Sequence, residues 1–224
     1  MTGDAHPRIL IVDDDEAMRR SMTFLFASVG LVAESFASAD AFLEALPRLA
    51  PPGPGALILD VRMPGTSGLE LQRRLADTGF PLPVLIVTGH GDVPMAVEAL
   101  KAGAFDFIEK PFKEQYLLDA VDKAVRRSQE ILTEDARRRT IADRFARLGR
   151  REREVLDRIM AGKPNKVIAW ELDLSIKTIE AYRASIMTKM EADSLAELVR
   201  MIAGLGDVEA RGRPARPDEP DASE

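Results

Sequence analysis

The sequence predicts a doubly wound α/β domain with a five-stranded parallel sheet, followed by a small all-α domain of four helices. Two observations support this prediction. In the first half of the chain, five short apolar runs alternate with segments of helical periodicity, as in a parallel sheet covered on both faces. In the second half the apolar runs stop, and four short helical segments follow one another up to Leu205.

The charge distribution divides the chain at about the same place. Residues 1–124 carry 11 basic and 18 acidic side chains, a net charge of −7, whereas residues 125–206 carry 17 basic and 13 acidic ones, a net charge of +4. A basic second domain indicates a polyanion partner. The chain has no cysteine, no apolar stretch that could span a bilayer and no signal-peptide pattern, so we expect a cytoplasmic protein without membrane contact.

Strand and helix signals alternate in a regular order through residues 1–124. The apolar runs predict strands at residues 8–13, 31–36, 57–60, 84–88 and 105–109. Helical periodicity predicts a helix that Gly30 stops, a helix at 39–49 with Ser38 as its N-cap, helices at about 68–77 and 93–102, and one that starts near Lys113.

The third predicted strand organises the first domain. Leu57-Ile58-Leu59 ends in Asp60, and Pro64-Gly65 then stops regular structure. In an open parallel sheet the carboxyl ends of the strands form the edge where ligands bind. The other predicted strands bring further polar side chains to this edge, namely Asp13 and Asp14, Thr88, and Lys110.

Together these side chains fit phosphoryl chemistry. Clustered carboxylates repel one another and need a cation, and hard oxygen ligands favour Mg²⁺. A lysine and a hydroxyl beside them suit a phosphoryl group, so Asp60 is the expected nucleophile and would form an acyl phosphate. A single aspartate after a strand is more often a turn former or a helix cap, but the joint occurrence at four strand ends argues against that interpretation.

Four motifs resemble the receiver domain of two-component response regulators over about residues 7–124. They are Val12-Asp13-Asp14, Asp60-Val61-Arg62-Met63-Pro64-Gly65, Val87-Thr88-Gly89-His90-Gly91 and Phe107-Ile108-Glu109-Lys110-Pro111-Phe112. The resemblance implies a flavodoxin-like receiver fold and a phosphorelay in which a sensor histidine kinase phosphorylates Asp60. It also implies no enzymatic turnover beyond self-phosphorylation and slow self-dephosphorylation at Asp60.

The resemblance assigns a metal-binding role to the acidic residues. Asp14, Asp60 and the backbone carbonyl of Arg62 would hold Mg²⁺, and Asp13 would order the site.

The resemblance also implies a switch. Thr88 and Lys110 would bind the phosphoryl oxygens, and the Lys110–Pro111 bond would be cis. Phe107 falls at the switch position, where an aromatic ring turns inward when Thr88 moves, although the residues alone leave a plain core role open. In related proteins the face made by the fourth helix and fifth strand, about residues 93–109 here, becomes a dimer surface on phosphorylation.

Two segments outside the domains have distinctive compositions. Residues 125–147 contain no Pro or Gly and are dense in charge, which predicts a helical, solvated connector rather than a core element. Residues 206–224 are rich in Pro, Asp, Glu, Arg and Ala, which predicts a disordered tail.

Residues 148–205 predict a helix-turn-helix domain. Helices are expected at residues 150–160, 165–172, 176–190 and 195–202, with Asn165 and Ser175 as the N-caps of the second and third. Asp173-Leu174-Ser175 forms the turn between these two helices. This arrangement indicates that the helix at 176–190 enters the major groove of DNA.

The periodicity of residues 176–190 separates a core face from a DNA face. Ile179, Tyr182, Ile186 and Met190 share the core face. The residues expected at the DNA are Lys177, Thr178, Glu180, Ala181, Arg183, Ala184, Thr188 and Lys189, together with Lys166 in the preceding helix. Glu180 and the alanines suit base edges, whereas the lysines and Arg183 suit phosphates. From periodicity alone, an amphipathic helix in a small bundle is an equal alternative.

Three motifs resemble the LuxR-type DNA-binding domain. They are Leu148-Gly149-Arg150-Arg151-Glu152-Arg153-Glu154-Val155-Leu156, Asn165-Lys166-Val167-Ile168-Ala169 and Leu174-Ser175-Ile176-Lys177-Thr178-Ile179-Glu180. Gly149 replaces the hydroxyl residue that usually caps the first helix, at an expected cost of a few tenths of a kcal/mol. With both domains, the chain is identified as a member of the FixJ subgroup of response regulators.

The expected function is therefore phosphorylation-gated transcription regulation. Phosphorylated Asp60 would favour a homodimer that binds promoter DNA, and the expected partners are a sensor histidine kinase, double-stranded DNA and RNA polymerase. Two other functions stay open. A Mg²⁺-dependent phosphatase with Asp13 as its nucleophile fits the Asp-x-Asp spacing but leaves residues 148–205 unexplained. A dimeric DNA-binding protein indifferent to phosphate would not need the complete set of acidic, hydroxyl and lysine positions.

Overall fold

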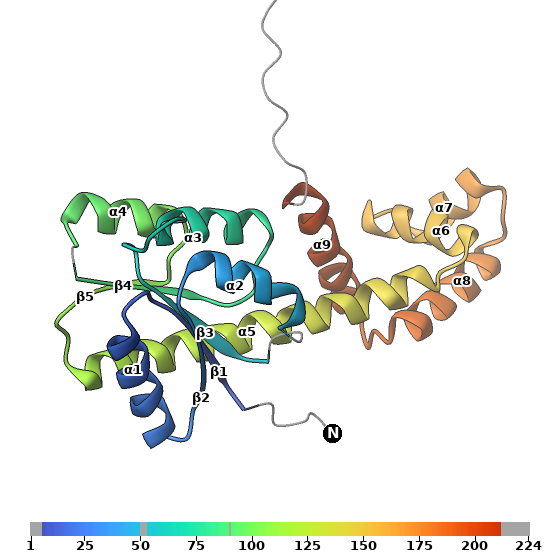
Figure 1. The fold of residues 1–224 in the computed structure, drawn as a ribbon. Coiled ribbons are helices and arrows are strands. Elements are labelled where there is room, and N and C mark those ends of the chain that lie inside the picture. Colours follow the sequence, from blue (N-terminus) through green and yellow to red (C-terminus); the bar gives the residue numbers. More distant parts are fainter. Residues whose placement is uncertain (1–5, 50–52, 90, 212–224) are drawn as a thin grey trace, which may run out of the picture. The chain divides into compact units, whose positions relative to one another are not determined.

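A computed structural model describes residues 6–49, 53–89 and 91–211 of the chain. The chain divides into two compact units, one up to Glu134 and one from Asp135 onwards. The first unit is a sheet covered by helices, and the described part of the second contains helices only (Figure 1). No helix in the described ranges is long and apolar enough to cross a membrane.

The sheet of the first unit has five parallel strands, as the sequence predicts. The strands are β1 (Arg8–Val12), β2 (Val32–Phe36), β3 (Gly55–Leu59), β4 (Val84–Thr88) and β5 (Asp106–Glu109). Their order is β2-β1-β3-β4-β5, so β3 lies in the middle of the sheet. Every adjacent pair is parallel, and all carboxyl ends therefore meet at one edge.

Strand β3 begins at Gly55, earlier than the predicted residue 57. Gly55 pairs with Arg8 in the register of β1 and β3, and a Cβ at residue 55 would lie 2.1 Å from the Arg8 carbonyl oxygen. Gly55 therefore permits the close approach of β1 and β3, which a residue with a side chain would prevent.

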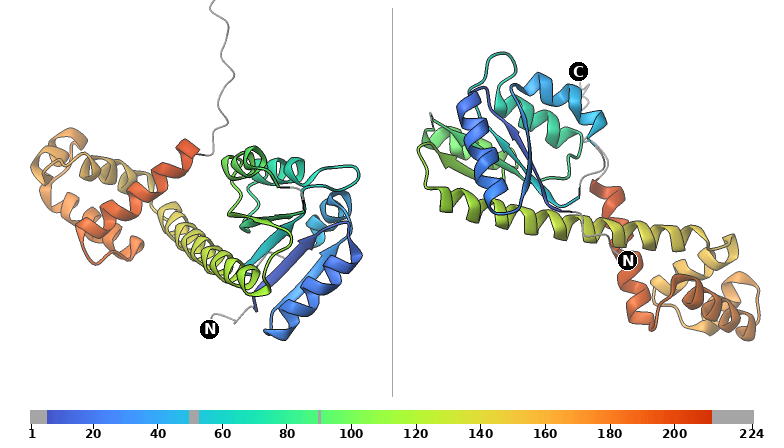
Figure 2. Two further views of the ribbon diagram at one scale, coloured as in Figure 1. Left: turned by 90° about the vertical axis from the view of Figure 1, so that its left-hand side faces the viewer. Right: turned by 60° about the horizontal axis from the view of Figure 1, so that its bottom comes forward.

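Helices cover both faces of the sheet (Figures 1 and 2). They are α1 (Glu16–Ser28), α2 (Ala39–Ala45), α3 (Gly68–Asp77), α4 (Val93–Lys101) and α5 (Glu114–Ala146). Successive strand residues alternate between the faces: Ile9 and Ile11 pack with residues of α1 and α5, whereas Leu10 and Val12 pack with residues of α2 and α3.

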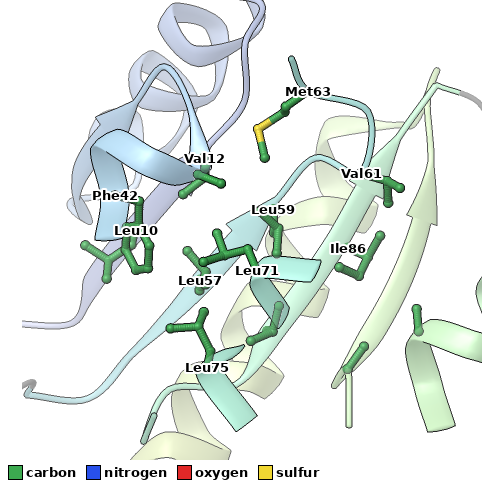
Figure 3. Packing of buried hydrophobic residues seen from close by; sticks show 14 of the residues in the cluster. Leu10, Val12, Phe42, Leu57, Leu59, Val61, Met63, Leu71, Leu75 and Ile86 are labelled. Carbon is green, nitrogen blue, oxygen red and sulfur yellow. The ribbon is translucent and has the colours of Figure 1, made fainter. Parts of the chain in front are cut away.

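The packing around β3 holds the strand that leads to Asp60. Leu57 and Leu59 are completely buried, and Figure 3 shows them between the side chains of the neighbouring strands and those of α3. Each fully buried leucine contributes about 1.5–3 kcal/mol relative to an exposed one. The backbone that carries the expected nucleophile therefore has a rigid support on both sides.

Local sequence signals set most helix ends. Gly30 adopts a φ of 77° after α1, and the Ser38 hydroxyl accepts a hydrogen bond from the Ala41 N–H at 3.1 Å, so both predicted signals are confirmed. The helix predicted to reach residue 49 ends at Ala45 and continues as a 3-10 turn, Leu46–Arg48. Pro47 explains the difference, because proline has no N–H to donate within an α-helix.

The predicted connector is helical but is not wholly solvated. Residues 125–147 lie almost entirely in α5, which runs without a break from the first unit into the second. Ser128 is completely buried, and its hydroxyl accepts a hydrogen bond from the Gly55 N–H at 3.1 Å. Ile141 is buried in the core of the second unit. Because the segment is dense in charged residues, its composition did not indicate that Ser128 and Ile141 are buried.

The second unit contains the four predicted helices. They are α6 (Arg150–Met160), α7 (Asn165–Leu172), α8 (Ile176–Met190) and α9 (Leu195–Arg211). Their shared core includes Val155 of α6, Ile168 of α7, Ile186 of α8 and Leu198 of α9.

Two details of the second unit differ from the prediction. The N-cap of α7 is Pro164 rather than Asn165, because the Pro164 carbonyl already accepts from the Ile168 N–H at 3.1 Å. Helix α9 continues to Arg211, beyond the predicted end at Ile202 and into the segment predicted to be disordered. Ala, Glu and Arg are good helix formers, and the two glycines of this extension, Gly204 and Gly206, cost only about 1 kcal/mol each. Residues 212–224 of the predicted tail lie outside the described residues.

We expect Ser128→Ala to lower the free energy of unfolding by about 1–3 kcal/mol, because it leaves the buried Gly55 N–H without an acceptor. Urea unfolding measures the change. Ser28→Ala is the matched control, since Ser28 is exposed on α1 and should change stability by less than about 0.5 kcal/mol. Equal stability of the two variants would contradict the structural role of Ser128.

Candidate functional site

The carboxyl edge of the sheet brings the predicted residues together. Asp13 follows β1, Asp60 follows β3, Thr88 ends β4 and Lys110 follows β5. Asp13, Asp60 and Thr88 are buried, with 2%, 6% and 1% of their surface exposed. Asp14 is exposed beside them.

Lys110 connects the two buried carboxylates. Its Nζ donates to Asp13 Oδ2 at 2.7 Å and to Asp60 Oδ1 at 3.3 Å. The other oxygen of Asp60 accepts from the Arg62 N–H at 3.0 Å, and the Asp60 N–H donates to the Val12 carbonyl at 2.8 Å. The expected nucleophile is therefore fixed by contacts from three separate segments.

The electrostatics of the site favour a cation. Burial raises the pKa of Asp60 above its ordinary value of 3.8, against the opposing attraction of Lys110, and the nearby Asp13 raises it further. Although burial alone would lower the pKa of Lys110, its contacts with Asp13 and Asp60 raise it above 10.5. Lys110 is thus held in its charged form.

The acidic residues fit a divalent metal ion. One carboxylate oxygen from each of Asp13, Asp14 and Asp60 lies within 4.8 Å of the others. Carboxylate oxygens are the ligands that Mg²⁺ prefers. Arg62, whose carbonyl is the further predicted ligand, is exposed and lies in the loop after Asp60, between the buried Val61 and Met63.

The predicted switch residues lie around this edge. Thr88 is buried, and its carbonyl accepts from the Lys110 N–H at 2.8 Å. Phe107 in β5 is half-buried and packs against the core cluster that includes Leu59 and Ile86. A Cβ at Gly91 would lie 2.9 Å from Cε1 of the Phe107 ring, so the absence of a side chain at this position leaves room for the ring.

The Lys110–Pro111 bond is cis, as predicted.

Sequence reasoning missed residues that hold the two loops of the site. Arg19 of α1 donates to the carbonyls of Asp13 and Asp14. A Cβ at Gly68 would lie 2.0 Å from the Asp60 carbonyl oxygen, so only glycine permits the start of α3 to pack so closely. Neither residue has a signal in the sequence, because a lone arginine or glycine in or near a helix is common.

Helix α8 has the two predicted faces. Ile179, Ile186 and Met190 are completely buried, and Tyr182 is half-buried. Of the residues predicted to contact DNA, five on α8 and one on α7 are exposed, namely Lys177, Glu180, Ala181, Ala184, Thr188 and Lys166. Thr178 and Arg183 are half-buried, and the Thr178 N–H donates to the capping hydroxyl of Ser175 at 3.0 Å. Trp170 of α7 is 83% exposed.

Lys189 differs from the other predicted phosphate-binding residues. Its Nζ donates to Glu152 Oε2 at 2.7 Å, and the Ser185 hydroxyl donates to Glu152 Oε1 at 2.6 Å. The Gly149 N–H donates to Glu152 as well, at 2.6 Å. These donors, that of Lys189 first, lower the pKa of Glu152 to about 2. Glu152 therefore connects α6 to α8 by hydrogen bonds, and Lys189 forms an ion pair within the protein.

Two family profiles match the chain. The response regulator receiver domain matches residues 9–122, and the luxR family of bacterial regulatory proteins matches residues 146–202. The first covers the sheet with its acidic edge, and the second covers α6, α7 and α8.

Curated proteins and solved structures agree with the profiles. The chain is 48% identical to the transcriptional regulatory protein FixJ of Bradyrhizobium diazoefficiens over 92% of its own length and 98% of the relative's. It is 42% identical to the response regulator protein TodT of Pseudomonas putida, over 89% and 86%. Among solved structures, the response regulator StyR has a TM-score of 0.77 at 39% identity, covering 89% of this chain and 99% of StyR. Full-length FixJ from B. japonicum has a TM-score of 0.54 at 48% identity, covering 90% and 98%.

We expect Glu152→Gln to lower the stability of the second unit by about 1–2 kcal/mol near pH 7, because hydrogen bonds to a charged group are lost while the partly exposed Lys189 is screened by solvent. The folded-state pKa of about 2 lies below the ordinary 4.5, so this stabilisation is complete above pH 4.5 and is lost as the pH falls towards 2. Urea unfolding followed by far-ultraviolet circular dichroism at several pH values measures the difference. Glu154→Gln is the control, since its partners Arg150 and Arg151 are exposed. A stability difference between Glu152→Gln and wild type that does not change with pH would contradict the assignment.

Proposed function

The chain belongs to the FixJ subgroup of two-component response regulators and is a phosphorylation-dependent, DNA-binding regulator of transcription, and from this premise we propose that Asp60 is its phosphorylation site. The observation that carries this assignment is the pair of hydrogen bonds from Lys110 to Asp13 and Asp60 at the carboxyl edge of the sheet. They place a lysine charge beside a buried carboxylate that has a raised pKa.

The proposed reaction is phosphoryl transfer from a phosphohistidine of a sensor histidine kinase. An Asp60 carboxylate oxygen attacks the phosphorus, a P–O bond forms, the P–N bond breaks, and the kinase imidazole leaves and takes up a proton. Lys110 and the Thr88 hydroxyl bind the phosphoryl oxygens. Asp14, Asp60 and the Arg62 carbonyl hold Mg²⁺, with Asp13 ordering the site; the bound ion supplies neutralisation of the charge that develops on the phosphoryl group. Slow self-dephosphorylation at Asp60 is the only other turnover.

The proposed response is dimerisation through α4 and β5. A phosphoryl group at Asp60 draws Thr88 towards it, and the Phe107 ring then turns inward from its half-buried position. The exposed apolar side chains of α4 support this face: Val93 is 77% exposed, Leu100 48% and Val97 43%. Such a surface is favourable to bury against a second copy.

The dimer presents two copies of α8 to paired half-sites of double-stranded DNA. Lys166 and Lys177 bind phosphates, as does Arg183, and the exposed Glu180, Ala181 and Ala184 lie at the base edges. Thr178 and Thr188 flank this surface. Lys189 is reassigned to holding α8 through Glu152. The dimer recruits RNA polymerase at the promoter, and the protein therefore acts in the cytoplasm, where the chromosome is.

We also propose the limits of the domains. We assign residues 1–124 to the receiver, 125–147 to a helical linker, 148–205 to the DNA-binding domain and 206–224 to a tail, whose first residues continue α9 up to Arg211. The two profile matches at 9–122 and 146–202 support the first and third limits.

The phosphatase alternative has lost its support. Most of residues 148–205, which this alternative leaves unexplained, lie within the match to the luxR family of bacterial regulatory proteins at residues 146–202. Hydrolysis of a generic phosphatase substrate by the purified protein would restore this alternative.

We expect wild-type protein to shift from monomer to dimer when acetyl phosphate and Mg²⁺ are added, as measured by size-exclusion chromatography with light scattering. Asp60→Asn should not respond, because an amide cannot form the acyl phosphate. A shift of both proteins would show that Asp60 is not the acceptor. A response by neither would disprove phosphate-induced dimerisation. Normal gene activation by Asp60→Asn would support the phosphate-indifferent DNA-binding protein.

We expect Lys177→Ala and Lys189→Ala to separate DNA binding from folding. Loss of the exposed Lys177 should weaken binding to all DNA sequences and reduce the slope of log K against log salt by about 1. Loss of Lys189 should instead lower the free energy of unfolding by about 1–2 kcal/mol, because Glu152 loses a charged donor. Fluorescence anisotropy with labelled DNA and urea unfolding measure the two effects. An unchanged unfolding curve for Lys189→Ala would disprove its anchoring role.

A further inference from the structure

Arg19 of α1 holds the loop that follows β1. Its Nη1 donates to the Asp13 carbonyl at 2.7 Å and to the Asp14 carbonyl at 2.9 Å. The Arg19 N–H donates to the Asp15 carbonyl at 3.0 Å. The third bond is the ordinary backbone bond of the first helical turn. Both acceptors of the guanidinium are backbone oxygens, so the side chain holds the loop without contacting the carboxylates of Asp13 and Asp14.

The other contacts of this loop involve the side chains of Asp13 and Asp15 rather than that of Asp14. Lys110 and the Asp15 N–H bind the two oxygens of the Asp13 carboxylate. Asp15 caps α1 by accepting from the Ala17 and Met18 N–H groups at 2.8 and 3.3 Å. Asp14 is exposed, and among the described residues nothing forms a hydrogen bond with its carboxylate. The Arg19 contact with the Asp14 carbonyl and the Asp15 N–H bond to Asp13 hold the two ends of the Asp14–Asp15 peptide, and Arg19 is the partner that acts from α1.

We propose that Arg19 is a positioning residue of the cation site: it holds the backbone of Asp14 where the Asp14 carboxylate can join those of Asp13 and Asp60. The proposal rests on the proposed function, in which Asp14 and Asp60 hold Mg²⁺. Residues that orient the ligands of a metal typically change its affinity about 10–100-fold when they are replaced.

A purely electrostatic role and a positioning role of Arg19 predict opposite changes in metal affinity when the residue is replaced. A guanidinium near a cation site repels the cation, so removal of its charge alone would strengthen metal binding. If Arg19 acts by holding the Asp14 backbone, its removal weakens metal binding despite the relief of this repulsion. The direction of the change therefore decides between the two roles.

The test is a Mn²⁺ titration of the full chain, with free Mn²⁺ measured by electron paramagnetic resonance. Mn²⁺ is a suitable probe because it also prefers carboxylate and carbonyl oxygens. We expect Arg19→Gln to raise the dissociation constant about tenfold. Arg19→Lys keeps a positive charge but offers a compact ammonium in place of the planar guanidinium, and should give an intermediate value.

Arg20→Gln is the matched control. Arg20 is the next residue of α1, its side chain is 80% exposed, and it forms an ion pair with Glu16. This variant removes the same charge from the same helix without touching the loop, and its dissociation constant should stay within about twofold of the wild-type value. Urea unfolding of each variant establishes that it is folded.

Three results would overturn the proposal. If Arg19→Gln binds Mn²⁺ as tightly as wild type or more tightly, the metal site stands and Arg19 does not position it. Equal weakening by Arg20→Gln would show that the effect does not depend on the contacts of Arg19 with the loop. A wild-type protein that binds no Mn²⁺ would remove the proposed metal site itself, and the role of Arg19 with it.

Discussion

The hydrogen bonds of Lys110 to two buried carboxylates are the interaction on which the acidic edge depends. Asp13 and Asp60 come from strands that are neighbours in the sheet, and their charges repel each other in a place with little access to water. Lys110, from the far edge strand, offsets this repulsion and connects three strand ends. The packing of β3 and the close contact of Gly68 keep Asp60 in reach of that lysine.

Both units of the chain contain buried carboxylates, and Glu152 and Asp60 differ in how fully their charges are satisfied by hydrogen-bond donors. Glu152 accepts from Lys189, Ser185 and Gly149, and its pKa falls to about 2. At Asp60 the effect of burial outweighs the attraction of Lys110 and the hydrogen bond from the Arg62 N–H, so the pKa of Asp60 rises. A carboxylate with several good donors is stabilised in its charged form and serves as a structural anchor. One that is buried with fewer donors retains the capacity to react with a phosphoryl group or to bind a cation.

The sequence predicts the sheet and its acidic edge because both depend on local patterns. Each strand is a short apolar run, and each polar residue that follows one must lie at the same edge of a parallel sheet. Contacts between distant segments have no such pattern. Ser128 stands in a highly charged run yet bonds to Gly55, and Lys189 resembles Lys177 until Glu152 of another helix is placed beside it. Arg19 likewise acts on backbone carbonyls, which carry no side-chain signal.

The exposure of Trp170 gives the chain a natural optical label. It is the only tryptophan of the sequence and lies on α7, next in the chain to the proposed DNA-binding helix α8. An indole with 83% of its surface in water emits at long wavelength, and a shift to shorter wavelength accompanies any contact that excludes solvent from it. When the light is absorbed by indole but not by tyrosine, this emission therefore reports on the surroundings of the second unit alone, because the first unit has no tryptophan.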